Sequence, residues 1–349
     1  MRALSLPPFR AERLTYLPRN MHSFVSSLNI CVLWSAWNMD YEEILTAKTA
    51  WYYYHEDLTQ AQIAELLGLS RMKVIKLLER AKRSGIIQFR FRHDSENRLG
   101  AEQRLASRYG LKDCFVVPGP AAVEETNENV AKAASMYVGS RISGEAFINI
   151  GYGDTTGRIL NHLAIDAEQT ISCVSLTGGV SHYLPNARSS VFNSRLYLIP
   201  TPLIVSSEEV AEAMTAEKSV QDVRDLVPLS TLSVVGVGAM NDQATVRMSG
   251  VLTANDFLLL KRNGAVGDIL SHFINAEGEP VSTDLEARTI STGLDTLKGL
   301  DNVIGVAAGL TKVQAIRAVL RGGYLDVLIT DEPTAEAVLE EHETHGNTF

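Results

Sequence analysis

The segment from Thr59 to Ile87, TQAQIAELLGLSRMKVIKLLERAKRSGII, limits what this chain can fold into more than any other, because it predicts two short capped helices joined by a tight turn. Thr59 is the expected N-cap of the first helix, and Gln62 stands where a capping box needs its second partner. Gly68 supplies the turn, and Ser70 caps the second helix. The segment therefore predicts a helix-turn-helix.

The second helix of this pair is amphipathic, and its polar face is cationic. The stretch from Leu66 to Arg92 has eight Lys or Arg and one acid, a net charge of +7, within a chain whose net charge is −9. An acidic protein has no general attraction for phosphate, so cations gathered in one place indicate a docking site for a polyanion. The apolar stripe of the helix is expected to hold Val74, Leu77, Leu78 and Ala81.

A short wing is expected after this helix. Beyond the helix stop at Gly85, Ile87, Phe89 and Phe91 alternate with polar residues, which is typical of a strand whose arginines meet backbone phosphate. We predict a winged helix-turn-helix over residues 41–95 that binds double-stranded operator DNA, and the alternative is a helical hairpin with a solvated basic face. The expected DNA contacts are Thr59, Gln60, Ser70, Arg71, Met72, Lys73, Lys76, Arg80 and Arg83.

A helix from Glu43 to His55 is expected to precede the pair and to offer dimer contacts. Its side chains expected to face the helix-turn-helix are Ile44, Leu45, Ala47 and Trp51. A linker helix is expected over residues 96–112. We expect the first 40 residues to be an extension without fixed structure, or the product of an upstream start codon with Met39 as the true start. Their apolar patch is too short to span a bilayer, and they lack a secretory signal pattern.

The three cysteines, Cys31, Cys114 and Cys173, are few, widely spaced and odd in number. This usage favours a reducing, cytoplasmic setting without structural disulfides, and we expect no membrane partner. The length of 349 residues with 45% apolar content fits two domains: the small DNA-binding domain at residues 41–95, here called the reader, and a larger domain.

The larger domain, residues 113–342, is predicted to be a doubly wound, mostly parallel α/β sheet. Apolar runs alternate with helical runs, which implies parallel strands covered on both faces. The strands are expected at CFVVPG, AFINI, ISCVS, LSVVGVG, FLLL, VIGVAAG and VLITD.

Candidate ligand residues follow two of these strands, where open α/β sheets bind their ligands. The first loop holds Gly151, Gly153, Asp154, Thr155 and Thr156 and opens a helix, so its amides and hydroxyls can face an anion. The second loop, Thr177, Gly178 and Gly179, also follows a strand and also offers amides and a hydroxyl to an anion. Glycine turns also join strands to helices without binding anything, so the anion site is favoured by the repetition rather than by either loop alone.

Two charged residues occur at further expected strand ends. Asp268 lies beside flexible backbone and is suited to accept hydrogen bonds from sugar hydroxyls, or it satisfies the amides of its own helix. Lys312 follows VIGVAAGL, where an ammonium would pair with phosphate or be solvated at the surface.

These motifs resemble the SorC/DeoR-type family of sugar-binding transcriptional regulators, from about Glu42 to Leu339. The matching segments occur in the family's order: TQAQIAELLGLSRMKVIKLLERA in the reader, followed by GYGDTT, SLTGGV, VVGVGA, RNGAVGDIL, AAGLTKVQAI and GGYLDVLITDEPTA. The resemblance implies an effector domain related in fold to phosphosugar isomerases, a homodimer or homotetramer, and a phosphorylated sugar or polyol effector. It places the phosphate near Gly153, Thr155, Thr156, Thr177, Gly178 and Gly179, and it makes Asp268 and Lys312 effector-site positions.

The expected function is a DNA-binding regulator of a carbohydrate or signal-uptake operon, controlled by such an effector, with no catalysis and no cofactor. The alternative is a sugar-phosphate isomerase or deaminase-like enzyme fused to a DNA-binding domain, with Asp268 transferring protons. Against it, the chain has NDQATVRMSG where a deaminase-like enzyme would have an Asp-Gly-His segment. His162, His182 and His272 are scattered, and no spacing predicts a metal site.

Overall fold

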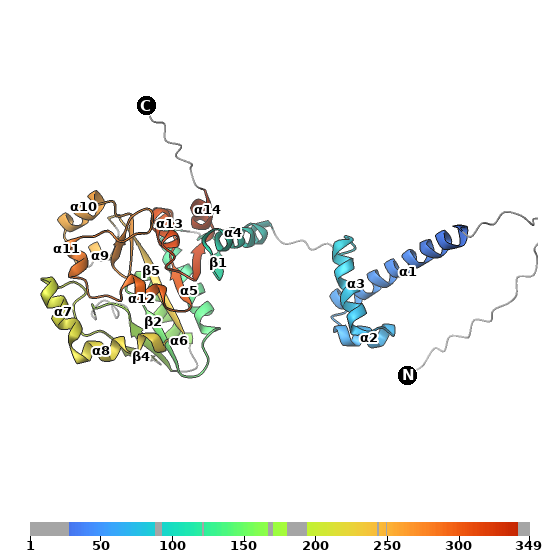
Figure 1. Ribbon diagram of the computed structural model, residues 1–349, viewed down its shortest axis with the longest axis horizontal. Helices are drawn as coiled ribbons and strands as arrows, with labels where there is room; N and C mark the ends of the chain where they lie inside the picture. The colour runs from blue at the N-terminus through green and yellow to red at the C-terminus, as the bar shows by residue number, and fades with distance from the viewer. Residues whose placement is uncertain are drawn as a thin grey trace, which may run out of the picture. The chain divides into compact units, whose positions relative to one another are not determined.

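The computed structural model describes residues 28–87, 93–120, 122–166, 170–179, 194–242, 244–248 and 250–340. The chain forms two compact units, Met1–Arg90 and Phe91–Phe349, because most contacts between residues lie within one unit or the other. Each unit is described by itself (Figure 1). The first contains the helices of the predicted reader, and the second contains the predicted α/β sheet.

The first unit holds α1 (Leu28–Tyr54), α2 (Gln60–Leu67) and α3 (Arg71–Arg83). The predicted capping box at the start of α2 is present, with the Gln62 amide donating to Thr59 Oγ1 at 3.4 Å and the Thr59 amide donating to Gln62 Oε1 at 2.9 Å. Gly68 ends α2 in the left-handed conformation with φ 64°. Ser70 Oγ accepts from the Lys73 amide at 3.2 Å and caps α3.

The first helix differs from the sequence-based expectation in its start. It begins at Leu28 rather than at Glu43, so residues 28–40 are helical instead of part of an extension without structure. The stretch from Leu28 contains no proline or glycine, and nothing in it interrupts a helix that is already nucleated downstream. The predicted wing at residues 88–92 lies outside the described residues.

The packed face of α1 is also not the expected one. Ile44 and Trp51, expected to face the helical pair, are 59% and 55% exposed. Thr46, Thr49 and Ala50 are buried instead, and each threonine hydroxyl donates to a carbonyl four residues earlier. Small side chains let α3 approach closely, which decides the packing in favour of this narrow face.

The second unit is built on a sheet in the order β1-β9-β8-β5-β2-β3-β4. Its strands are β1 (Asp113–Val117), β2 (Ala146–Ile150), β3 (Ile171–Ser175), β4 (Ser194–Tyr197), β5 (Leu232–Ala239), β6 (Gly267–Ile269), β7 (His272–Ile274), β8 (Val303–Val306) and β9 (Val327–Asp331). All pairs along that order are parallel, whereas β6 and β7 add an antiparallel hairpin to the end of β5.

The helices of this unit are α4 (His93–Tyr109), α5 (Thr126–Gly139), α6 (Asp154–Asp166), α7 (Glu208–Ala216), α8 (Lys218–Arg224), α9 (Thr245–Met248), α10 (Ala254–Arg262), α11 (Asp284–Ala287), α12 (Leu294–Lys298), α13 (Val313–Arg321) and α14 (Glu332–Leu339). Short 3-10 turns are η1 (Val123–Glu125), η3 (Val227–Leu229) and η4 (Leu310–Lys312).

Both faces of the sheet are covered, as the sequence predicts. Helices α5 and α6 pack on one face together with Ile148 and Val234. Helices α4, α12, α13 and α14 pack on the other face together with Val174 and Val235. Successive residues of β5 thus enter opposite cores, which explains why the strand is an uninterrupted apolar run.

Two sequence-based assignments in this unit are wrong. The run FLLL, expected as a strand, lies in α10, where Thr253 and Asp256 form a capping box and Phe257 and Leu260 are buried three residues apart. Asp268, expected at the end of a parallel strand, lies within the antiparallel strand β6 opposite Gly238. A three-residue strand has too little alternation to be predicted from its own residues.

Helix α4, which covers most of the predicted linker helix at residues 96–112, lies within the second unit. It packs against β1 and α14, and Arg98 pairs with Glu332 at 3.4 Å. β1 is an end strand of the sheet, and two of its amides are capped by side chains. The Val116 amide donates to Glu102 Oε1 at 2.7 Å, and the Cys114 amide donates to its neighbour Asp113 at 2.9 Å.

Candidate functional site

A cleft of about 790 Å³ opens at the carboxyl ends of β2, β5 and β8. It is lined by the loops that follow these strands, together with η1, α9 and β6. Six of the ten residues predicted to bind an effector line it: Gly153, Asp154, Thr155, Thr156, Asp268 and Lys312. The fold therefore gathers residues from three distant parts of the sequence.

The loop after β2 leads directly into α6 at the cleft. Gly153 has φ 145°, a backbone region that favours glycine. Thr155 and Thr156 are buried in the first turn of α6, where helix amides lack acceptors within the helix. Thr156 Oγ1 donates to the Gly153 carbonyl at 2.9 Å, which fixes the loop. The arrangement leaves a helix N-terminus facing the cleft, a setting that favours an anion.

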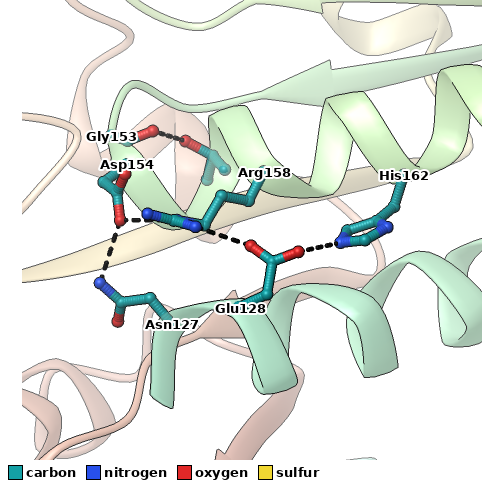
Figure 2. Close-up of polar contacts among 7 residues, drawn as sticks. Asn127, Glu128, Gly153, Asp154, Arg158 and His162 are labelled. Carbon is teal, nitrogen blue, oxygen red and sulfur yellow. Dashed lines mark hydrogen bonds and ion pairs between the residues drawn. The ribbon is translucent and has the colours of Figure 1, made fainter. Parts of the chain in front are cut away.

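Asp154 carries an unfavourable charge for such an anion, but its carboxylate is engaged by other groups (Figure 2). Its Oδ2 accepts from Asn127 and from Arg158 Nε, each at 3.0 Å. Arg158 also donates to Glu128 at 2.6 Å, and Glu128 contacts His162 Nε2 at 2.7 Å. The hydrogen bond from Arg158 is the main cause that holds the pKa of Glu128 below its ordinary value. This network joins α5 to α6 and offsets the charge of Asp154.

Asp268 is buried at the base of the cleft, with 8% of its surface exposed. Its Oδ1 would lie 1.9 Å from a Cβ at position 238, so only Gly238 leaves room for it. Burial raises the pKa of Asp268 to about 6, while the Ser271 amide, donating at 3.3 Å, and the charge of Lys312 act in the opposite direction. The carboxyl group is therefore a hydrogen-bonding group held in a poorly solvated place.

Lys312 lies at the end of η4, before α13, as the sequence predicts. It is half-buried, and burial lowers the pKa of its ammonium while Asp154 and Asp268 oppose the change. The preceding Gly309 has φ 109° and donates its amide to Thr334 Oγ1 at 2.8 Å. Loop and lysine are thus anchored to α14.

The remaining predicted effector residues do not line this cleft. Gly151 is buried beneath it, against Leu270 and β5. In the second glycine loop the Gly178 amide donates to Ile290 at 2.9 Å and the Gly179 amide to Thr201 at 2.8 Å, and Thr177 bridges to Ser291. These two amides are committed to backbone bonds, so the loop serves chain packing rather than offering a second set of free anion donors.

Several cleft residues were missed by the sequence reasoning. They are Val123, Glu124, Thr126, Asn127, Tyr152, Gly236, Val237, Gly238, Ala239, Asn241, Ala244, Thr245, Val246, Met248, Leu270, Ala308, Gly309 and Thr311. The pair Gly236 and Gly238 at the end of β5 was the available signal, because glycine in a strand marks close approach of another group. The polar side chains of η1, α5 and α9 gave no such local signal.

On the reader, the start of α3 presents an exposed mixed surface. Arg71 is exposed and its Nε donates to Gln60 at 3.5 Å, and Met72 is 63% exposed. Lys76 is exposed one turn further on and has no hydrogen bond or ion pair among the described residues. The caps Thr59 and Ser70 are exposed too. Cationic and apolar side chains at the start of a second helix match what base and phosphate contacts require.

Three of the cations expected to contact DNA pair with acids within the protein. Lys73 Nζ lies 2.5 Å from Glu42 Oε1, and Arg80 pairs with Glu42 Oε2. The hydrogen bond from Lys73 is the main cause that lowers the pKa of Glu42. Arg83 pairs with Glu79 at 3.6 Å and stays exposed. The sequence analysis assigned these cations to DNA without an acid partner, because the acid that engages Lys73 and Arg80 lies 31 and 38 residues away.

Of the three histidines considered in the sequence, His162 and His272 have partners within the protein. His162 pairs with Glu128, and His272 contacts Glu286 at 2.5 Å and the Thr292 carbonyl at 3.0 Å. His182 lies outside the described residues. Within the described ranges, no three His, Cys, Asp or Glu side chains gather as metal ligands, and no helix is long and apolar enough to cross a bilayer.

Known proteins resemble this chain along most of its length. Residues 93–340 match a family model described as "Putative sugar-binding domain". The transcriptional regulator LsrR of Klebsiella pneumoniae subsp. pneumoniae is 38% identical over 302 residues, covering 85% of this chain and 93% of the regulator. LsrR of Escherichia coli K12 is 35% identical, with 85% and 95% covered. The solved structure of the full-length sorbitol operon regulator SorC from Klebsiella pneumoniae has a TM-score of 0.62 at 24% identity, with 85% and 98% covered, and shows a shared fold.

Proposed function

Because the chain belongs to the SorC/DeoR-type family of sugar-binding transcriptional regulators, with LsrR regulators among its relatives, we propose that a phosphorylated sugar or polyol in the cleft controls its affinity for operator DNA. The chain is a transcriptional regulator and not an enzyme, as its relatives are named. Residues 41–95 are the proposed DNA-binding domain, residues 96–112 the linker helix and residues 113–342 the effector domain. We place its action in the cytoplasm, where operator DNA is.

The observation that carries the proposal is the convergence of a helix N-terminus and Lys312 on one cleft. The phosphate would lie at Gly153, Thr155 and Thr156, where first-turn amides of α6 are available and the helix dipole favours negative charge. Lys312 would supply a full positive charge. The network that binds Asp154 to Arg158 and Asn127 supports this placement, because it offsets the one carboxylate at the same helix terminus.

Asp268 would select the hydroxyl part of the effector. Its buried carboxyl group has the backbone amide of Ser271 as one donor and retains capacity to accept from ligand hydroxyls. Hydroxyl groups that fail to reach it would leave a buried acceptor unpaired, so sugars of different configuration should differ in affinity. The second loop, Thr177 to Gly179, has no ligand role in this proposal.

The reader would contact DNA through the start of α3. In this proposal the exposed Arg71 and Met72 would make base contacts, and the exposed Lys76 and Arg83 would contact phosphate. One recognition helix covers only half of an operator site, so we propose a homodimer or homotetramer. The exposed apolar stripe of α1 with Tyr41, Ile44 and Trp51 supports that assembly, because such a face favours a partner.

A thermal-shift panel of pentose, hexose and polyol phosphates, each beside its unphosphorylated form, tests the effector. We expect phosphorylated compounds alone to raise the melting temperature, since only they engage the helix terminus and Lys312. Lys312→Ala should abolish the shift, whereas Lys132→Ala, an exposed lysine on α5, should keep it. Active compounds must then change DNA binding in an anisotropy assay. Equal shifts by free sugars, or hits that leave DNA affinity unchanged, would refute phosphate control.

A further inference from the structure

Glu42 on α1 engages two cations of α3 at once. Its Oε1 lies 2.5 Å from Lys73 Nζ, and its Oε2 accepts from Arg80 Nη1. Lys73 and Arg80 are seven residues apart, so they project from one face of α3 and are separated by two turns. A single carboxylate therefore bridges this face.

The bridge has the chemistry that a DNA phosphate would offer. Carboxylate and phosphate oxygens both accept charge-assisted hydrogen bonds from ammonium and guanidinium groups. Lys76 lies between the two bridged cations in the sequence, is exposed, and has no acceptor among the described residues. Helix α3 thus carries an available cation for phosphate and two cations whose acceptor is already present.

The bridge is also exposed enough to open. The side chains of Glu42, Lys73 and Arg80 are 40%, 41% and 43% exposed. Ion pairs with this exposure contribute little to stability and weaken further with salt. A phosphate brought near the helix can therefore compete for either cation, which a buried pair would not permit.

We propose that Glu42 competes with DNA phosphates for Lys73 and Arg80, and so restrains the affinity of the reader for DNA of any sequence. The inference rests on the proposed DNA-binding function of α3. Sequence-independent binding is mainly electrostatic, whereas base contacts by Arg71 and Met72 do not involve the bridge. Glu42 then increases the ratio of specific to non-specific affinity, because it lowers chiefly the second.

The test is Glu42→Gln in the full chain, which removes the charge and keeps the size. Glu43→Gln is the matched control: it changes the same charge on the same helix at an exposed residue without a partner among the described residues. Binding to a labelled duplex of random sequence is measured by fluorescence anisotropy over a salt series. We expect E42Q to steepen the slope of log affinity against log salt concentration by about one to two. We also expect it to bind the duplex about tenfold tighter at ~0.1 M salt. E43Q should leave the slope unchanged.

Equal slopes for E42Q and E43Q would overturn the inference, since the effect would be one of net charge. The gain must also vanish when Lys73→Gln and Arg80→Gln are added to E42Q, and a persistent gain would overturn it too. If E42Q unfolds the reader, Glu42→Asp keeps the charge but is too short to bridge both cations, and should steepen the slope by about one; an unchanged slope refutes the bridge. An unaltered chain that binds no duplex at all refutes the proposed function instead.

Discussion

Replacing Asp268 by Asn should stabilise the effector domain at neutral and alkaline pH. The carboxyl group is 8% exposed, and burial raises its pKa to about 6 from an ordinary value of 3.8. Keeping the group ionised in the folded state therefore costs about 3 kcal/mol, because each unit by which the pKa is raised corresponds to about 1.4 kcal/mol. Asn has the shape of the neutral carboxyl, still accepts from the Ser271 amide, and fits against Gly238.

The stability gained by Asn at position 268 depends on pH, because proton binding by Asp268 is linked to folding. Below pH 3.8 Asp268 is protonated in both the folded and the unfolded chain, so its burial has no ionisation cost. The cost grows between pH 3.8 and about pH 6, because the unfolded chain is ionised there while the folded chain still binds a proton, and it is complete above about pH 6, where both states are ionised. The advantage of Asn should be about 3 kcal/mol at pH 8 and about half of that at pH 5.

Thermal unfolding followed by circular dichroism at both pH values measures this advantage. For a domain of this size, about 3 kcal/mol corresponds to a rise of about 6–12 °C at pH 8. Asp301→Asn, which alters an exposed acid, should change little. The same D268N variant should lose its response to the effector, since proteins keep such destabilising groups for function. Equal stability of D268N and the unaltered chain at pH 8, or a gain that does not depend on pH, would show the reasoning to be wrong.

Three further outcomes are expected. Lys76→Ala should reduce the salt slope of DNA binding by about one, whereas Lys48→Ala on α1 should not; anisotropy titrations measure both, and equal slopes would remove Lys76 from the interface. Gly178→Ala should destabilise the fold by about 1–3 kcal/mol in urea unfolding, because a Cβ there would lie 2.4 Å from the Pro202 carbonyl oxygen, and an unaffected variant would contradict that crowding. Light scattering should give a dimer or tetramer, and a monomer with and without DNA would exclude the proposed assembly.

The features predicted correctly from the sequence are those that depend on neighbouring residues. The capping box of Thr59 and Gln62, the left-handed Gly68 and the Ser70 cap all act within one helical turn. The parallel sheet was predictable because strands buried on both faces are uninterrupted apolar runs. The loop from Gly153 to Thr156 was found for the same reason, since a helix N-terminus after a strand is local information.

What could not be predicted depends on contacts between distant residues. The pairing of Glu42 with Lys73 and Arg80 requires α1 to lie along α3 with one particular face, which the exposed Ile44 and Trp51 would not suggest. The position of Asp268 depends on the antiparallel pairing of β6 with β5. In both cases the decisive partner is far away in the chain, and its residue type alone does not identify it.

The capped edge of β1 determines where the sheet can grow. An uncovered end strand is a template onto which another chain adds a strand, and such additions lead from dimers to open fibres. Here the outward amides of Cys114 and Val116 already donate to carboxylates of Asp113 and Glu102. A visiting strand would have to displace these acceptors and bring its own carbonyls close to two acids. Addition of a strand from another chain at β1 is therefore disfavoured, and growth of the sheet by strand addition would have to use its other edge, at β4.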